Sequence, residues 1–216
     1  MHRLDPAAVP VPCCLKKFKH GQHQWGDLGL PDKREVRDCL RQLQGGLCAY
    51  CEGSLDQLGE HVEHFRTRSG HPELTFDWGN LYWSCGQHDS CGNHKDTRGK
   101  PYHPDHLINP RTEDPDMFFK FRADGTIAVR DGLSAADEVR ARETIRVFSL
   151  DYDYGRLRRM RQNAIRAYDA QEPGIIDCLM EMPVEDRRLF VREELEKTAS
   201  QPFCTVIRHY LGGLDR

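Results

Sequence analysis

The spacing of hydrophobic residues predicts an irregular start followed by one well-defined helix. Residues 1–30 are rich in Pro, Gly and His and predict an irregular arm. A helix is predicted from Pro31 to the glycine pair at 45–46, because apolar residues recur there with helical spacing. These apolar positions are Val36, Leu40 and Leu43.

The middle of the chain predicts short strands and loops. Residues 47–66 alternate in the manner of short strands around a cysteine turn, and residues 78–98 resemble a loop with short helical turns. The prolines that follow exclude long regular structure. They are Pro101, Pro104, Pro110 and Pro115. Segment 119–129 then predicts a hairpin, because two apolar runs flank the turn-forming pair Asp124-Gly125.

The last third of the chain is predicted to be mainly helical. Ser134 has the side chain of an N-cap for a helix that reaches about Phe148. Helical spacing of apolar residues also covers 154–170 and 184–197. The apolar stripes of these helices are more typical of a packed core than of a binding surface.

Composition is that of a folded, slightly acidic protein. Charged residues make up 30% and hydrophobic residues 38% of the 216 positions, as in globular domains. No apolar run of about 18 residues occurs, so no membrane partner or membrane-spanning helix is expected. The formal net charge is −3, whereas a chain that binds nucleic acid strongly by itself is usually basic. Nucleic-acid binding would therefore need a local basic surface or a partner.

Cysteine usage indicates metal ligation in a reducing compartment. The first residues lack the apolar stretch of a signal peptide, so the chain is expected to stay in the cytoplasm. Nine cysteines occur, an odd number, and they cluster unevenly. In the cytoplasm this pattern favours metal sites and free thiols over a disulfide framework.

Two cysteine pairs predict a structural zinc site. Cys48 and Cys51 are separated by two residues, the spacing at which two thiolates on a tight turn bind one tetrahedral ion. The second pair is less regular, because Cys85 and Cys91 are separated by five residues. His88 has the better spacing from Cys85, so the fourth ligand is either Cys91, which we favour, or His88.

The residues between and after these pairs can support hydrolytic chemistry. Glu63 and His64 are adjacent, so one can bind a divalent metal while the other faces a water molecule. Asn80 can hydrogen-bond to backbone and hold a loop in shape. His94 can complete a metal site, and Lys95 can supply positive charge beside a phosphate. Each residue alone is more often structural, but their combination within the cysteine pairs favours a reactive site.

The motif segment resembles the HNH endonuclease family, whose ββα-metal fold presents a His on a strand, an Asn in a loop and a His or Asn on a helix. The matching runs are Glu63-His64, Asn80-Leu81 and Cys91 to Lys95. More closely, Cys-Ala-Tyr-Cys-Glu, His-Val-Glu-His-Phe-Arg and Phe-Asp-Trp-Gly-Asn-Leu resemble PtuB subunits of Septu-type antiphage defence systems, in their retron-associated branch. The HNH match covers about a quarter of the chain, and the closer one covers at least the first 100 residues.

This resemblance implies an α+β fold that is mainly helical, with a small zinc-stabilised ββα-metal (HNH) module embedded among helices. Residues 1–46 would form an N-terminal arm and helix, and residues 47–100 the nuclease module with its structural Zn²⁺. Residues 101–216 would provide a linker, the hairpin and a helical region for partner docking.

The resemblance also implies phosphodiester hydrolysis with a catalytic Mg²⁺ or Mn²⁺. His64 would be the general base, Asn80 would orient the loop beside it, and Glu63 would bind the metal. The position after the last cysteine, often a metal ligand in this family, is Gly92 here, so that role is assigned to His94 with Asn93 as the alternative. Arg66, Arg68 and Lys95 would position phosphates.

The implied role is the effector nuclease of a defence complex. The resemblance implies a PtuA-like P-loop ATPase as its partner. The chain has no GxxxxGK[ST] phosphate-binding loop of its own, so nucleotide sensing would have to come from elsewhere. In the retron branch, a reverse transcriptase and its RNA-linked DNA would be further partners. The motifs leave DNA and RNA substrates, tRNA included, equally open. The alternative function is a non-catalytic zinc-bound module that binds nucleic acid or protein, in which the cysteines matter but Glu63 and His64 do not.

Overall fold

The computed structural model describes residues 1–152, 155–171 and 173–212. The helices are α1 (Leu30–Gln44), α2 (Leu55–Leu58), α3 (Cys91–Thr97), α4 (Ala135–Val147), α5 (Arg156–Gln171), α6 (Ile175–Glu181), α7 (Val184–Thr198) and α8 (Cys204–Gly212). The strands are β1 (Glu60–His64), β2 (Leu81–Cys85), β3 (Phe119–Phe121) and β4 (Ile127–Val129). Short 3₁₀ turns occupy Cys13–Lys17, Trp25–Asp27, Pro72–Leu74, Trp78–Asn80, Pro104–His106 and Pro115–Met117. Among the described residues, no helix has the length and apolar character needed to cross a membrane.

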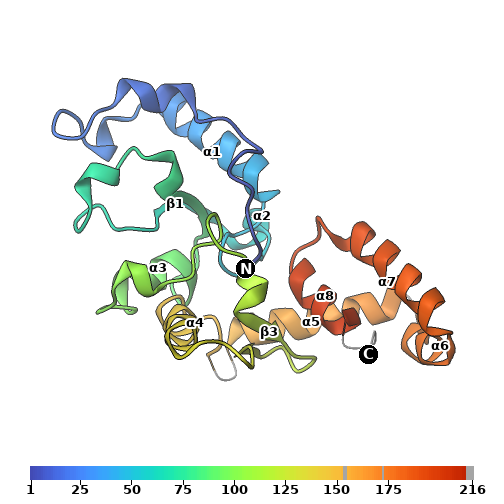
Figure 1. Cartoon of the computed structure of the whole chain (residues 1–216). Helices are drawn as coiled ribbons and strands as arrows, with labels where there is room; N and C mark the ends of the chain where they lie inside the picture. Colours follow the sequence, from blue (N-terminus) through green and yellow to red (C-terminus); the bar gives the residue numbers. More distant parts are fainter. Residues whose placement is uncertain (153–154, 172, 213–216) are drawn as a thin grey trace.

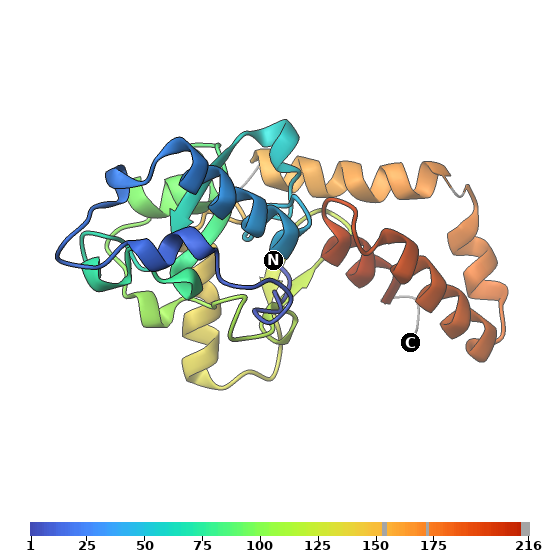
Figure 2. The same cartoon turned by 90° about the horizontal axis from the view of Figure 1, so that it is seen from above.

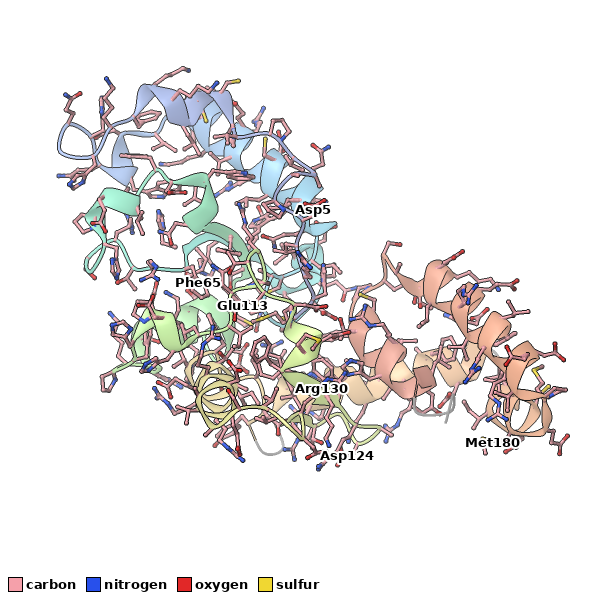
Figure 3. The ribbon with its side chains drawn as sticks, in the orientation of Figure 1. Asp5, Phe65, Glu113, Asp124, Arg130 and Met180 are labelled. Atoms are coloured by element: carbon pink, nitrogen blue, oxygen red, sulfur yellow. The ribbon has the colours of Figure 1, made fainter. Side chains whose placement is uncertain are left out.

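The chain divides into a body that contains the motif segment and a helical extension. Helices α5 to α8 extend away from the rest of the molecule in Figure 1, and the view in Figure 2 shows the same separation. Phe65 is buried in the body, whereas Met180 lies at the far end of the extension (Figure 3). The extension has a hydrophobic core of its own, formed by Ile165, Tyr168, Val191, Phe203, Val206, Ile207 and Leu211.

The two strands and the helix around the motifs form one small ββα unit. Strands β1 and β2 pair antiparallel, with Glu63 opposite Tyr82 and His64 opposite Leu81. All of β2 is buried, because α1 covers it on one side and α3 packs against it as well. The Gln44 side chain of α1 hydrogen-bonds to both the amide and the carbonyl of Trp83. The unit is therefore built into the centre of the body.

Two segments differ from the sequence-based prediction. Residues 55–58, expected within short strands, form helix α2. Residues 81–85 were expected in a loop with short helical turns, but they form strand β2. A strand that is buried on both faces has no alternation of apolar and polar residues, so periodicity does not identify it. The irregular arm is also more tightly packed than predicted, because Leu4, Val9 and Leu28 are buried in the body core.

Most other elements agree with the prediction. Helix α1 ends where Gly45 adopts a left-handed conformation with φ of +62°, and the hairpin is strands β3 and β4. The Ser134 hydroxyl accepts a hydrogen bond from the Asp137 amide and caps α4. The helix predicted from 154 is α5, whose first described residue is Arg156, since 153–154 lie outside the described residues. The α+β, mainly helical fold class is confirmed, with small antiparallel sheets.

Candidate metal and nuclease site

The four motif cysteines meet in one buried cluster. The sulfur atoms of Cys48, Cys51, Cys85 and Cys91 lie within 4.8 Å of one another. A tetrahedral Zn²⁺ with its usual Zn–S bonds separates its sulfurs by ~3.8 Å, so the cluster fits a structural zinc. The Cys85 amide also donates a hydrogen bond to the Cys48 sulfur at 3.3 Å, a contact that stabilises thiolate.

The structure also distinguishes the two candidates for the fourth ligand. Cys91 belongs to the cluster, whereas His88 is exposed and lies outside it. Burial raises the pKa of the Cys91 thiol well above its usual value, so the site needs a cation to hold four sulfurs as thiolates. Zinc ligation by Cys91 would join the start of α3 to the end of β2 and to the turn that carries Cys48 and Cys51.

Asn80 fixes the loop between the two strands. Its Oδ1 accepts a hydrogen bond from the Arg66 amide at 2.8 Å. Its Nδ2 donates to the carbonyl oxygens of Arg66 at 3.0 Å and Leu74 at 3.2 Å. The side chain therefore ties both ends of the loop together through backbone groups, as the sequence predicts for it.

His64 lies at the end of β1 with its ring orientation fixed. Its Nε2 lies 3.0 Å from the carbonyl oxygen of Thr75. A carbonyl oxygen only accepts, so Nε2 carries the proton and Nδ1 is the basic nitrogen. Burial, together with the smaller effect of the nearby cationic side chains Arg68 and Lys95, lowers the pKa of His64 to about 4. The imidazole is therefore neutral at pH 7 and can accept a proton.

Lys95 has a different place from the one that the sequence predicts. It is completely buried and lies 2.7 Å from Glu63 Oε1, so its ammonium cannot contact a phosphate in the cavity. It also donates to the His64 carbonyl at 3.0 Å and to Asp96 Oδ1 at 2.7 Å. Burial disfavours the charged form, but the charges of Glu63 and Asp96 outweigh it and raise the pKa of Lys95 above its usual value. Lys95 thus connects α3 to the end of β1.

His61 is a candidate ligand that the sequence-based reasoning missed. It lies two residues before Glu63 on β1 and therefore on the same face, with its Nε2 3.5 Å from Glu63 Oε2. Its Nδ1 is buried and has no hydrogen-bond partner among the described residues. The His-x-Glu spacing on a predicted strand is the signal that could have identified it.

Gly92 makes room for the Glu63 carboxylate. A Cβ atom at position 92 would lie 2.6 Å from Glu63 Oε2, which is closer than non-bonded atoms approach. The carboxylate therefore occupies the space that a larger residue at 92 would need. Glycine has no side chain that could bind a metal, so the position after the last cysteine supplies no side-chain ligand here.

An open cavity of about 490 Å³ lies beside His61, Glu63 and His64. It is lined by His61, Val62, Glu63, His64, Thr67, Arg68, Ser69, Asn93, Asp96 and Lys100. His94 is not among them, because its Nδ1 lies 2.9 Å from the Val147 carbonyl on α4. Asn93, the alternative considered for the last ligand, does line the cavity.

The two predicted phosphate-positioning arginines also differ in their surroundings. Arg66 forms an ion pair with Asp105, which reduces its availability to a phosphate. Arg68 lines the cavity and has no hydrogen-bond or ion-pair partner in the part of the chain that the structure describes. Arg68 is therefore available to a phosphate at the cavity, as is Lys100, the other cationic side chain that lines it.

Comparison with known proteins identifies two relatives, although no protein-family model matches the chain. Septu protein PtuB from Bacillus thuringiensis is 30% identical over 105 residues, which are 48% of this chain and 37% of that protein. The "Retron Vc95 putative HNH endonuclease" from Vibrio cholerae serotype O1 biovar El Tor is 31% identical over 141 residues, 60% of this chain and 64% of that protein. The matches thus span less than two thirds of either relative. The resemblance inferred from the motifs is confirmed as distant homology to both proteins.

Proposed function

We propose that the chain is a metal-dependent HNH endonuclease, the effector subunit of a retron- or Septu-type antiphage defence complex. It would hydrolyse phosphodiester bonds in DNA or RNA, tRNA included. The observation that carries this proposal is the buried His64 with a fixed tautomer, set beside the Glu63 carboxylate in one cavity. Distant homology to PtuB and to the retron protein supports the defence context.

In the proposed reaction, His64 removes a proton from the attacking water. The hydrogen bond from Nε2 to Thr75 holds the ring so that Nδ1 is the proton acceptor. Asn80 keeps the Thr75 side of the loop in position through its bonds to Leu74 and Arg66. Arg68 would contact a phosphate oxygen at the cavity edge.

Glu63 and His61 would hold the divalent ion. A carboxylate oxygen and an imidazole nitrogen are suitable ligands for Mn²⁺, and Mg²⁺ accepts the carboxylate with several waters. Adjacent ligand atoms of such an ion are about 3 Å apart, close to the 3.5 Å between His61 Nε2 and Glu63 Oε2. Bound there, the ion would stabilise negative charge on the phosphate and on the leaving oxygen.

His61→Ala is expected to weaken Mn²⁺ binding by roughly 10- to 100-fold, because it removes a ligand or the partner that orients one. His94→Ala is the matched control, since His94 faces Val147 and should leave Mn²⁺ affinity nearly unchanged. Titration calorimetry on the zinc-loaded chain measures both affinities without requiring activity. If His94→Ala loses Mn²⁺ and His61→Ala retains it, the metal ligand is His94, as the sequence-based prediction assigned it.

The helical extension would dock a PtuA-like P-loop ATPase. Apolar side chains of α6 and α7 are exposed there, including Met180 at 58%, Val184 at 50% and Leu189 at 54%. They lie in the part of the molecule that extends away from the ββα unit (Figure 2). A retron reverse transcriptase and its RNA-linked DNA would be further members of the assembly. Docking through residues 134–216 would leave the nuclease cavity free for substrate.

The double variant Met180→Glu/Leu189→Glu is expected to dissociate the co-expressed pair, because it places charge in an apolar interface. Leu30→Glu is the matched control, since Leu30 is 84% exposed on α1 and lies outside the proposed docking region. Gel filtration should show one complex for the parent and for Leu30→Glu, and two separate species for the double variant. Two separate species for the parent itself would contradict the partnership.

A further inference from the structure

A second cavity of about 410 Å³ adjoins the proposed nuclease site. It is lined by His20, Gly21, Gln22, His23, Gln24, Trp25, Arg68, Pro72 and Thr75. Arg68 borders this cavity and the nuclease cavity alike. The irregular arm thus forms a wall of a site that the ββα unit alone would lack.

This cavity touches the parts that hold His64 in place. The Trp25 ring meets the His64 ring edge-on, with centroids 4.6 Å apart. Thr75, whose carbonyl accepts the His64 hydrogen bond, forms another part of its wall. A group bound in this cavity would therefore contact Trp25 and Thr75, the residues that hold His64. Through Arg68 it would also lie next to a phosphate bound in the nuclease cavity.

The lining has the chemistry of a nucleobase site. It combines a half-buried indole with imidazole and amide side chains, which can stack on a base and hydrogen-bond to its edge. It contains no carboxylate and no thiol, so a metal ion is a poor fit, and Arg68 favours an anionic ligand. The Nδ1 of His23 accepts a hydrogen bond from the Lys19 amide at 3.1 Å, so its protonated Nε2 can donate.

The arm segment is already shaped before any ligand binds. Phe18 stacks on Phe76 with ring centroids 5.3 Å apart and packs edge-on against His23 at 5.4 Å. The Gln24 amide donates to Asp27 at 2.7 Å. Binding in a pre-shaped site loses less conformational entropy than binding to a loop that must first become ordered.

We propose that this cavity binds the base of a nucleotide that neighbours the scissile phosphate. The inference rests on the proposed nuclease function and adds a substrate feature to it. A base can enter the cavity only if it is unstacked and unpaired, so the preferred substrate has an unpaired nucleotide at the cleavage position. Trp25 supplies the stacking surface, His20 and Gln22 contact the base edge, and Arg68 binds the adjoining phosphate.

The test measures binding apart from cleavage, with His64→Ala protein in complex with its ATPase partner. The probes are fluorescent single strands of about 20 nucleotides, as DNA and as RNA, and their duplexes. A second set carries one abasic site that is moved along the strand, which removes a base but keeps every phosphate. One abasic position should weaken binding about 5- to 150-fold, the range of a base stacked on an aromatic ring.

The same loss should appear with Trp25→Leu, or with His20→Ala and Gln22→Ala together, and the abasic probe should then have no additional effect. His106→Ala and Gln42→Ala are matched controls at exposed positions outside both cavities, and they should bind like the parent.

Several results would overturn the base pocket. They are equal weakening of single strands and duplexes, no sensitive abasic position, or parental affinity in all pocket variants. Each of these results is compatible with nucleic-acid cleavage by the complex that contains His64. Absence of cleavage in that complex would instead overturn the proposed nuclease function.

Discussion

His64→Ala is expected to abolish nucleic-acid cleavage by the assembled complex while zinc content and assembly stay at parental levels. A general base contributes typically ~10²- to 10⁴-fold to a rate, and the other imidazole at the cavity, His61, is assigned to the divalent ion in the proposed function. The substitution removes a side chain that contacts Trp25 and Thr75 but makes no contact with the cysteine cluster. Cleavage of a labelled substrate, with elemental analysis of the same preparation, checks both expectations.

The matched control is His106→Ala, an exposed histidine outside the cavity, which should cleave like the parent. Asn80→Ala should give an intermediate loss together with lower stability, because it leaves the Arg66 amide without its partner. Each buried polar group left unsatisfied costs about 1–3 kcal/mol. Parental cleavage by His64→Ala would show that this site is not a nuclease centre. A non-catalytic zinc-bound module that binds nucleic acid or protein would then be the better reading.

Loss of zinc is expected to have the largest effect on the fold. We expect one Zn²⁺ per chain, and both Cys48→Ser and Cys91→Ser should lose it and unfold the ββα unit. Zinc binding in small zinc-dependent domains supplies about 10–16 kcal/mol of apparent free energy, more than a unit of this size can replace by packing. Elemental analysis and thermal unfolding with and without a chelator measure the effect.

His88→Ala controls for this experiment, because His88 lies beside the cluster in sequence but outside it in space. It should keep full zinc and the parental melting temperature. Folded protein without zinc would refute the structural role, and loss of zinc by His88→Ala alone would place the fourth ligand at His88.

Half of the cysteine cluster was predictable because its information is local. Two residues between Cys48 and Cys51 limit them to one turn, and a tight turn with two thiolates has few uses other than binding a metal. The backbone-bonding role of Asn80 was predictable for a similar reason, since a carboxamide both donates and accepts.

The orientation of α3 could not be predicted from the sequence. For this reason the surroundings of His94 and Lys95 differ from the predicted ones. Cys91 begins the helix with a φ of +59°, a left-handed conformation that L-residues rarely adopt. In the helix that follows, Gly92 and Lys95 lie against Glu63, whereas the His94 ring lies against the Val147 carbonyl of α4. Periodicity in a seven-residue helix does not reveal such a start.

The ion pair between Lys95 and Glu63 has a consequence for the resting protein. A carboxylate that is 2% exposed would strongly destabilise the fold if its charge were uncompensated, but the Lys95 ammonium already balances it. The charge of Glu63 is therefore compensated when no divalent ion is bound, so the protein can stay folded without that ion. Under the proposed function, the two metals would act on different properties: zinc would determine whether the protein is folded, and the divalent ion would determine only whether it reacts.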